Sequence, residues 1–147
     1  MRAVVQRVDR ASVFVGGKEI SRIGKGLLIF LGVEKADEKK DADYLLEKII
    51  HLRIFEDTEQ KMNRSLLDIG GEAMVVSQFT LLADCRKGRR PSFTEAEDPI
   101  RAKIMYEYFL KMAAGFIKGT GSGEFQASMS VELINDGPVT VILDSRR

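Results

Sequence analysis

The stretch ASVFVGGKEISRI, residues 11–23, decides how the amino-terminal part of this chain folds. Its residues Ala11–Val15 follow the alternating apolar and polar period of a half-buried β-strand. Gly16 and Gly17 form a two-residue hairpin signal, so the chain is expected to return as a second strand over Lys18–Ile23. The stretch therefore predicts an antiparallel hairpin.

Further strands are predicted on either side of this hairpin. Residues Arg2–Val8 alternate in the same way, whereas the run Leu27–Leu31 is apolar throughout, as in a strand that is buried on both faces. Gly24-Lys25-Gly26 supplies the turn that precedes this run. The first 33 residues are thus expected to hold roughly four antiparallel strands.

Two helices are predicted from start signals that precede apolar residues at helical spacing. Asp37 is the expected cap of the first helix, and its apolar stripe consists of Ala42, Leu45, Leu46, Ile49 and Leu52. Asp98 as N-cap and Pro99 in the first turn mark a second helix, which runs from Ile100 and ends before Gly119. Its inward-facing residues are expected to be Ile104, Tyr108, Phe109, Met112 and Phe116.

The remaining segments alternate between strands and connections. Strands are expected over Ala73–Phe79, Phe125–Leu133 and Val139–Leu143. Residues 57–72 predict a long loop with short structure, and Gly119–Gly123 predicts a flexible connector. Nothing divides the chain, so residues 1–147 are expected to form one α+β domain, a curved barrel-like antiparallel sheet with two main helices.

Size and charge narrow the class of protein. A chain of 147 residues matches one domain and buries enough surface to fold without a disulfide or a metal. The formal net charge is +1, so contact with nucleic acid would depend on local patches. Cys85 is the only cysteine, which excludes an internal disulfide and favours a cytoplasmic location. The sequence shows no signal-peptide pattern and no apolar stretch of membrane-spanning length.

Common catalytic groups are scarce in this sequence. His51 is the only histidine and falls at the end of the first predicted helix, which is a poor place for a Ser-His-Asp or Cys-His arrangement. One histidine and one cysteine do not supply a zinc ligand set, so no metal and no other cofactor is expected. Cys85 stands among basic residues that favour a reactive thiolate. A cysteine-dependent hydrolase therefore stays open as one alternative.

Two polar motifs follow apolar, β-branched strands: Ser77-Gln78-Phe79-Thr80-Leu81 and Asn135-Asp136-Gly137-Pro138-Val139-Thr140. Amides at the end of a strand lose their ladder partners, so those of Phe79 and Thr80 are suited to stabilising an oxyanion. The alternative is that these polar side chains only satisfy nearby backbone groups. Together with the opening Met1-Arg2-Ala3-Val4-Val5-Gln6-Arg7-Val8, the motifs resemble the D-aminoacyl-tRNA deacylases, and the resemblance runs from Arg2 to about Ile142.

The resemblance implies a homodimeric enzyme that hydrolyses the ester bond of D-aminoacyl-tRNA. It assigns the catalytic segment to Ser77, Gln78, Phe79 and Thr80. An unactivated hydroxyl is a weak nucleophile, so we expect the ribose hydroxyl of the terminal adenosine to help activate water. Covalent catalysis by Thr80 is the alternative mechanism.

The resemblance also gives Gly137 and Pro138 a role. In the family, a cis peptide bond joins this pair, which enters the active site of the partner subunit and fills the space that an L side chain needs. Glycine has no side chain, so glycyl-tRNA is expected to be a second substrate. Residues that match the family's substrate pocket are Arg7, Ala102, Phe125 and Met129. Without the resemblance, Phe125 and Met129 would be core residues that share one sheet face.

A run of basic residues, Arg86, Lys87, Arg89 and Arg90, comes directly after the catalytic segment. Such a run is usually a solvated surface, but its position favours contacts with tRNA phosphates, which depend on salt and ignore tRNA sequence. DNA and membranes are not expected partners. The chief alternative to an enzyme is a non-catalytic RNA-binding or dimerisation module. The sequence leaves open the roles of Pro91-Ser92-Phe93 and of the tail Asp144–Arg147.

Overall fold

The computed structural model describes all residues from 1 to 147. Its elements are, in chain order, β1 (Arg2–Val15), β2 (Lys18–Ile23), β3 (Gly26–Gly32), α1 (Lys39–His51), β4 (Phe55–Glu56), β5 (Met62–Arg64), α2 (Leu66–Ile69), β6 (Glu72–Ser77), the 3₁₀-helix η1 (Phe79–Leu82), α3 (Pro99–Phe116), β7 (Thr120–Ser122) and β8 (Ser130–Asp144). The region 57–72 holds only short elements, as the sequence predicted.

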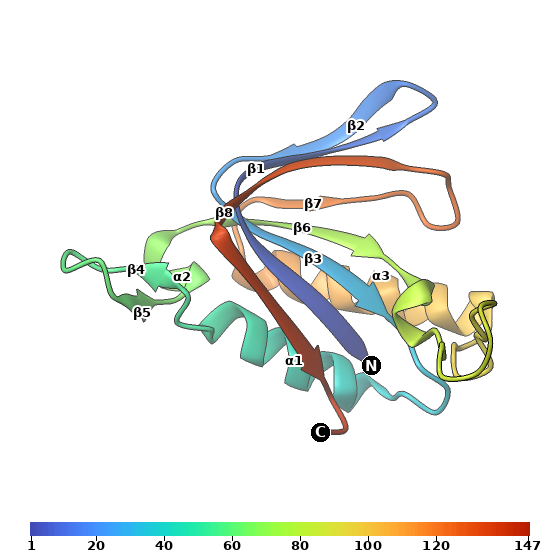
Figure 1. Cartoon of the computed structure of the whole chain (residues 1–147). Coiled ribbons are helices and arrows are strands. Elements are labelled where there is room, and N and C mark those ends of the chain that lie inside the picture. Colours follow the sequence, from blue (N-terminus) through green and yellow to red (C-terminus); the bar gives the residue numbers. More distant parts are fainter.

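Strand β1 is the centre of the sheet (Figure 1). It pairs antiparallel with β3 through Arg2–Val8, with β2 through Ala11–Val15, and with β8 along most of its length. Strands β6 and β7 are then added to β3 in parallel. The predicted α+β fold with a barrel-like sheet is confirmed. The two parallel pairings depart from the expected all-antiparallel sheet because helical crossovers lead from β3 to β6 and from β6 to β7.

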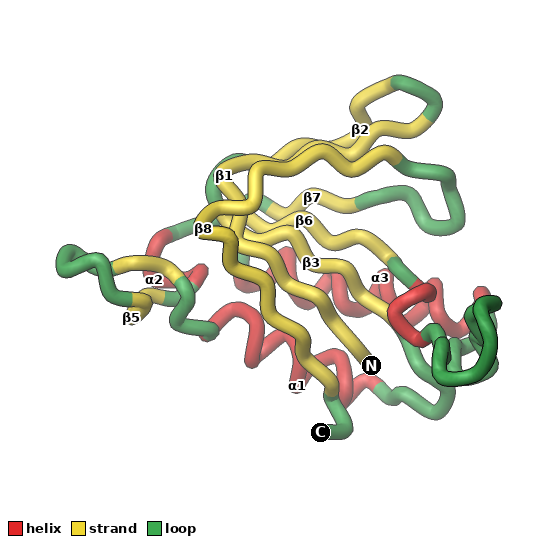
Figure 2. Tube along the Cα trace, in the orientation of Figure 1, coloured by secondary structure: helices red, strands yellow, loops and turns green.

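Helices α1 and α3 lie side by side against one face of the sheet (Figures 1 and 2). Strand β3 is buried on both faces. Its residues Leu27, Ile29 and Leu31 belong to the main core with residues of both helices, whereas Leu28 belongs to a smaller core on the opposite face. This arrangement explains why β3 is apolar at successive positions.

Two boundaries in the amino-terminal half differ from the predictions. The strands expected at Arg2–Val8 and Ala11–Val15 are one continuous strand, whose pairing passes from β3 to β2. Helix α1 begins at Lys39 with Glu38 as its N-cap, so the expected cap at Asp37 is wrong. Asp37 is fully buried, and its carboxylate lies 2.7 Å from the Met1 ammonium. A buried carboxylate needs such a charged partner. The Asp37 side chain therefore binds the Met1 ammonium instead of capping α1.

The carboxy-terminal tail belongs to the same buried cluster. The Met1 ammonium donates a hydrogen bond of 2.9 Å to Ser145 Oγ, and Arg146 donates one of 3.0 Å to the Asp37 carboxylate. The two chain ends therefore lie close together at one end of the sheet (Figure 1). The sequence left the role of this tail open. In the structure, the tail helps to hold Asp37 and the amino terminus in place.

Helix α3 buries a different stripe from the predicted one. Its buried residues are Ala102, Met105, Tyr106, Phe109 and Ala113. Of the predicted set, Phe109 is buried and Tyr108 and Met112 are partly buried, whereas Ile104 and Phe116 are 57% and 56% exposed. The helix is apolar on more than one side, so its packing against α1 and β7 decides which stripe is covered.

The segment that follows α3 also differs from the predictions. Thr120–Ser122 form strand β7 beside β6, so the expected flexible connector is wrong. The strand expected over Phe125–Leu133 begins only at Ser130. Before it the chain turns at Gln126, whose φ of 65° is incompatible with an extended strand. From Ser130, strand β8 continues to Asp144 and includes the separately predicted strand Val139–Leu143.

Candidate active site

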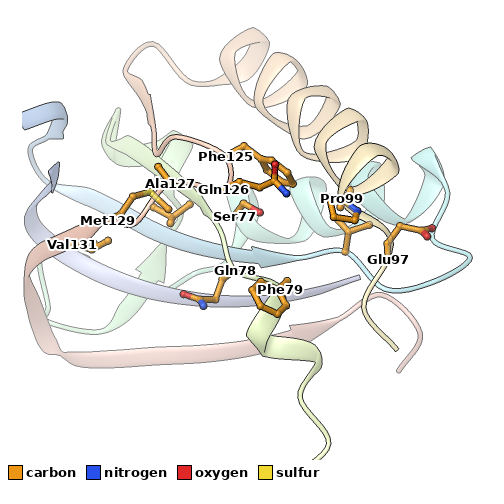
Figure 3. Close-up of a pocket in the computed structure, with 13 residues that line it drawn as sticks. Ser77, Gln78, Phe79, Glu97, Pro99, Phe125, Gln126, Ala127, Met129 and Val131 are labelled. Carbon is orange, nitrogen blue, oxygen red and sulfur yellow. The ribbon is translucent and has the colours of Figure 1, made fainter. Parts of the chain in front are cut away.

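A cavity of about 590 Å³ opens where β6 ends, beside the start of α3 and the turn before β8 (Figure 3). Six predicted site residues line it: Ser77, Gln78, Phe79, Ala102, Phe125 and Met129. The structure thus brings together residues from three segments that are distant in the sequence. Most of the lining is apolar, as is typical of sites that take a small organic group.

The predicted catalytic segment, Ser77–Thr80, forms where the hydrogen-bond ladder of β6 stops. Strand β6 ends at Ser77, two residues before the predicted end, and Gln78 donates its amide to the Leu31 carbonyl at 2.8 Å. The chain then turns into η1, which begins at Phe79. The first amides of a helix have no partner inside that helix, so those of Phe79 and Thr80 are available for other acceptors.

The Thr80 hydroxyl has a polar neighbour but no base. It accepts a hydrogen bond from the side-chain amide of Gln78. No hydrogen bond joins it to a carboxylate or to the single histidine, His51, whose ring bonds the Glu47 carbonyl at the end of α1. A nucleophilic hydroxyl requires an adjacent base, and Thr80 lacks one in this chain.

Tyr106 supports the cavity from behind, and the sequence analysis did not single it out. Its hydroxyl donates a 2.8 Å hydrogen bond to the Val75 carbonyl of β6, and its ring lies 5.9 Å from that of Phe125. Burial raises the pKa of Tyr106 to about 12, so the hydroxyl stays neutral at neutral pH. Tyr106 lies three residues before Phe109, and this helical spacing is the sequence signal that would have identified Tyr106 as an inward-facing residue.

The turn that carries Phe125 brings Met129 over the end of β6. Gly123 donates its amide to the Val75 carbonyl at 3.1 Å, and the Glu124 amide donates to the Met129 sulfur at 3.4 Å. A Cβ atom at Gly123 would lie 2.7 Å from that sulfur, so a side chain at this position would displace the Met129 thioether. Phe125 and Met129 therefore share a cavity wall, and the prediction that they share the face of one strand is wrong.

Gly137 and Pro138 lie outside this cavity. They are exposed within β8, joined by a cis peptide bond, and do not line the cavity of their own chain. Asn135 spans the pair, since its side chain accepts from the Val139 amide at 3.1 Å and donates to the Thr140 hydroxyl at 3.0 Å. These contacts explain why the second motif carries an amide side chain at Asn135 and a hydroxyl at Thr140.

Arg7 is buried beside the same pair. Its guanidinium donates to the Ile54 carbonyl at 2.6 Å and lies 3.0 Å from the Asp136 carboxylate. A Cβ atom added to Gly137 would approach this guanidinium to 3.0 Å. Arg7 thus contacts the Gly137–Pro138 element and does not line the cavity.

The basic run forms a loop whose base is closed next to η1. Asp84 and Ser92 exchange two backbone hydrogen bonds of 2.8 and 3.0 Å. Arg86 binds the Asp84 carboxylate through two contacts of 2.9 and 2.8 Å and holds the pKa of that carboxyl well below its usual range. Lys87, Arg89 and Arg90 are exposed and form no ion pair with other residues of the chain. The four cations therefore divide into one paired and three free.

Comparison with known proteins identifies the group to which this arrangement belongs. The family model described as D-Tyr-tRNA(Tyr) deacylase matches residues 4–144. This chain belongs to the D-aminoacyl-tRNA deacylase family. The match includes both polar motifs and every predicted site residue.

Individual deacylases of the family are similar over their whole length. The D-aminoacyl-tRNA deacylase of Syntrophus aciditrophicus (strain SB) is 65% identical over 147 residues, which cover 100% of this chain and 99% of the relative. That of Petrotoga mobilis is 54% identical over 148 residues, with the same coverage. Curated relatives thus carry the name of an enzyme, a hydrolase that acts on aminoacyl-tRNA.

Solved structures share the fold. A structure of a c-Myc DNA unwinding element binding protein has a TM-score of 0.93, is 41% identical and covers 98% of both chains. A probable eukaryotic D-amino acid tRNA deacylase has a TM-score of 0.81 at 16% identity, with 97% of each chain covered. The second likeness concerns the fold alone. No helix of this chain is both long and apolar enough to cross a membrane.

Proposed function

We propose that this protein hydrolyses the ester bond of D-aminoacyl-tRNA and releases the free amino acid and tRNA. Family membership over residues 4–144 supports the reaction class. The observation that carries the proposal is the cavity that Ser77, Gln78 and Phe79 line together with Phe125 and Met129 (Figure 3). We expect the enzyme to act in the cytoplasm, where aminoacyl-tRNA is used in translation.

In the proposed mechanism, no side chain of this protein acts as a base, and fixed backbone donors stabilise the charge that develops on the ester while the ribose oxygen that leaves the acyl carbon takes up a proton. The amides of Phe79 and Thr80 would receive the ester oxygen as negative charge develops on it, which is often the largest contribution to catalysis. The ribose hydroxyl of the terminal adenosine would assist the attacking water. This route suits a site in which Thr80 does not line the cavity and its hydroxyl has no basic partner.

The alternative mechanism gives Thr80 a covalent role. Replacement of Thr80 by alanine separates the two routes, because it removes the hydroxyl and leaves the amide in place. Retained hydrolysis by Thr80→Ala excludes the covalent route. Complete loss in a variant with an unchanged circular dichroism spectrum supports it instead.

We further propose that the cavity is completed by Gly137 and Pro138 of a second copy. In one chain these residues are exposed and lie outside the cavity. Strand β8 pairs only with β1, so its other edge offers unpaired backbone groups along a strand of 15 residues. A long free edge of this kind is a ready surface for a symmetric partner.

The incoming backbone would select by shape. A rigid main chain beside the α-carbon leaves space for the hydrogen of a D-amino acid and excludes an L side chain, and each tenfold of discrimination requires about 1.4 kcal/mol. Glycine presents only hydrogens, so glycyl-tRNA should also be hydrolysed. Resistance of glycyl-tRNA equal to that of L-aminoacyl-tRNA would contradict selection by shape.

The test is the release of amino acid from matched substrates. Purified protein should deacylate D-Tyr-tRNA and leave L-Tyr-tRNA intact. A protein that binds both and hydrolyses neither would be the non-catalytic RNA-binding module. The exposed Cys85 supplies the control, since Cys85→Ser should retain activity and a loss would support the cysteine-dependent alternative.

A further inference from the structure

We propose that Phe79 and Phe93 form a stacking platform for an unpaired base at the 3′ end of the tRNA. This inference rests on the proposed function, because it takes aminoacyl-tRNA as the substrate. It assigns a role to the Pro91-Ser92-Phe93 segment, which the catalytic mechanism does not use. Phe79 lines the cavity, Phe93 follows the basic loop in the chain, and the two rings are in contact.

The geometry of the pair is the first observation. Phe79 is 56% exposed and Phe93 is 38% exposed, although phenylalanine is among the residues most often buried. Their ring centroids are 5.0 Å apart with an angle of 62° between the planes, an edge-to-face contact. The edge-to-face arrangement leaves aromatic surface open to solvent.

The backbone around Phe93 is held from several sides. Ser92 is bonded to Asp84 in both directions, and the Ala96 amide donates to the Phe93 carbonyl at 3.1 Å. Farther along, Glu97 donates its amide to the Val33 carbonyl at the end of β3. A side chain on such a fixed segment presents its ring at a small cost in conformational entropy.

The surroundings of the pair indicate what kind of ligand fits. Phe79 itself lines the cavity proposed for the ester, and Phe93 follows the loop that carries the three unpaired cations Lys87, Arg89 and Arg90. A nucleotide offers a flat base and a phosphate. Proteins recognise unpaired nucleotides by stacking their bases on aromatic side chains beside basic residues. The single-stranded end of an aminoacylated tRNA has this chemistry and must reach the cavity.

The experiment measures binding without catalysis. The probe is an uncharged RNA hairpin with an unpaired CCA end, in which 2-aminopurine replaces the last adenine and reports stacking by loss of fluorescence. Phe93→Ala should weaken binding by roughly 5- to 150-fold, the range for one lost base–aromatic contact. Phe93→Tyr keeps an aromatic ring and should keep both the affinity and the quenching.

Two controls separate stacking from other effects. Phe116→Ala removes another exposed phenylalanine, at the end of α3, and should change nothing. A blunt RNA hairpin without the CCA end should bind wild type and Phe93→Ala equally. Equal weakening on the blunt hairpin, or unchanged binding of the CCA probe by Phe93→Ala, overturns the inference.

A subunit contact is the competing explanation for two exposed aromatic rings. Sedimentation of Phe93→Ala distinguishes it, because a platform variant keeps the oligomeric state of wild type. Loss of that state together with loss of RNA binding would overturn the inference. With D-Tyr-tRNA as substrate, Phe93→Ala should raise KM and leave kcat nearly unchanged. A wild type that binds the CCA probe and hydrolyses nothing would refute only the proposed function.

Discussion

Strands β3 and β8 both pair with β1, but they meet solvent in opposite ways. Every residue of β3 except the half-buried Phe30 is buried, whereas no residue of β8 is. Strand β3 has a neighbour on each edge and β8 has one only. The comparison separates two tasks: β3 holds the core of a single chain together, and β8 presents Gly137 and Pro138 on a surface that one chain leaves open.

The largest effect on stability is expected from truncating a side chain in the buried strand β3. Ile29 is fully buried in the main core, so Ile29→Ala should lower the free energy of unfolding by about 2–5 kcal/mol, since the lost contacts are not replaced. Urea denaturation followed by circular dichroism measures this loss.

The matched change on β8 is Ile142→Ala. Ile142 is 76% exposed, and a surface substitution usually changes the free energy of unfolding by less than about 0.5 kcal/mol. A larger loss that depends on protein concentration would sharpen the comparison by showing that a partner covers β8. Equal, concentration-independent losses at both sites would contradict the division of tasks.

A second large effect is expected at Gly137, this time on activity. Its φ of 120° is strained for any residue with a side chain, and an added Cβ would lie 2.9 Å from the Val139 side chain and 3.0 Å from Arg7. Gly137→Ala should therefore displace the Gly137–Pro138 element, and hydrolysis of D-Tyr-tRNA should fall by about 100-fold or more, equivalent to about 2.7 kcal/mol.

Gly115→Ala is the control for that variant. Gly115 lies in α3 with open space around its Cα, so alanine should keep full activity and stabilise the helix by about 0.5–1 kcal/mol. Full activity of Gly137→Ala would show that the conformation of this element is not needed for hydrolysis.

An intermediate effect is expected when two defective chains are mixed. Ala102→Met should fill the cavity of its own chain, while Gly137→Ala should spoil the cavity of the partner. If the subunits exchange freely, half of the dimers are mixed and each has one intact site, which restores about a quarter of wild-type activity. Deacylation of D-Tyr-tRNA after co-refolding measures this restoration. No restoration, with mixed dimers present, would contradict a site shared between subunits.

Sequence reasoning succeeded where local patterns decide the structure. Asp98 and Pro99 start α3, and Asp98 accepts from the Ile100 and Arg101 amides. The segment from Ser77 was recognised as the end of a strand because its polar residues follow an apolar run. These features depend on neighbours in the chain.

Sequence reasoning failed where contacts between residues that are distant in the chain decide the structure. The choice between two apolar stripes on α3 depends on packing against α1 and β7. The positive φ of Gln126 breaks an alternating pattern that would otherwise continue into β8. The sequence pattern indicates Asp37 as a helix cap, because no local signal shows its pairing with the Met1 ammonium 36 positions away. The exposed position of Gly137 within one chain likewise depends on the whole sheet.

A smaller effect is expected in the basic loop, which we propose contacts a partner, as β8 does. Arg89→Ala removes an unpaired cation, so tRNA affinity should fall by about tenfold or less, and the slope of log affinity against log salt should drop by about 0.7–0.9. The fall should be the same for every tRNA, as filter binding at several salt concentrations can measure. Arg86 is bound to Asp84, and Arg86→Ala should therefore weaken binding less. A loss confined to one tRNA would contradict phosphate contacts.

The smallest effect is expected behind the cavity, at Tyr106. Its hydroxyl donates to Val75, and Tyr106→Phe should lower the free energy of unfolding by about 0.5–1.5 kcal/mol.

Burial raises the pKa of the Tyr106 phenol from 10 to about 12. The neutral form is favoured by folding, so this contribution is complete below pH 10 and is lost as the pH rises towards 12. Unfolding of the two proteins at pH 8 and pH 11 measures the difference, and wild type should lose more stability than Tyr106→Phe. Equal pH dependence would mean that Tyr106 does not ionise on unfolding, and a change of the kcat profile between pH 6 and 9 would contradict a neutral, supporting tyrosine.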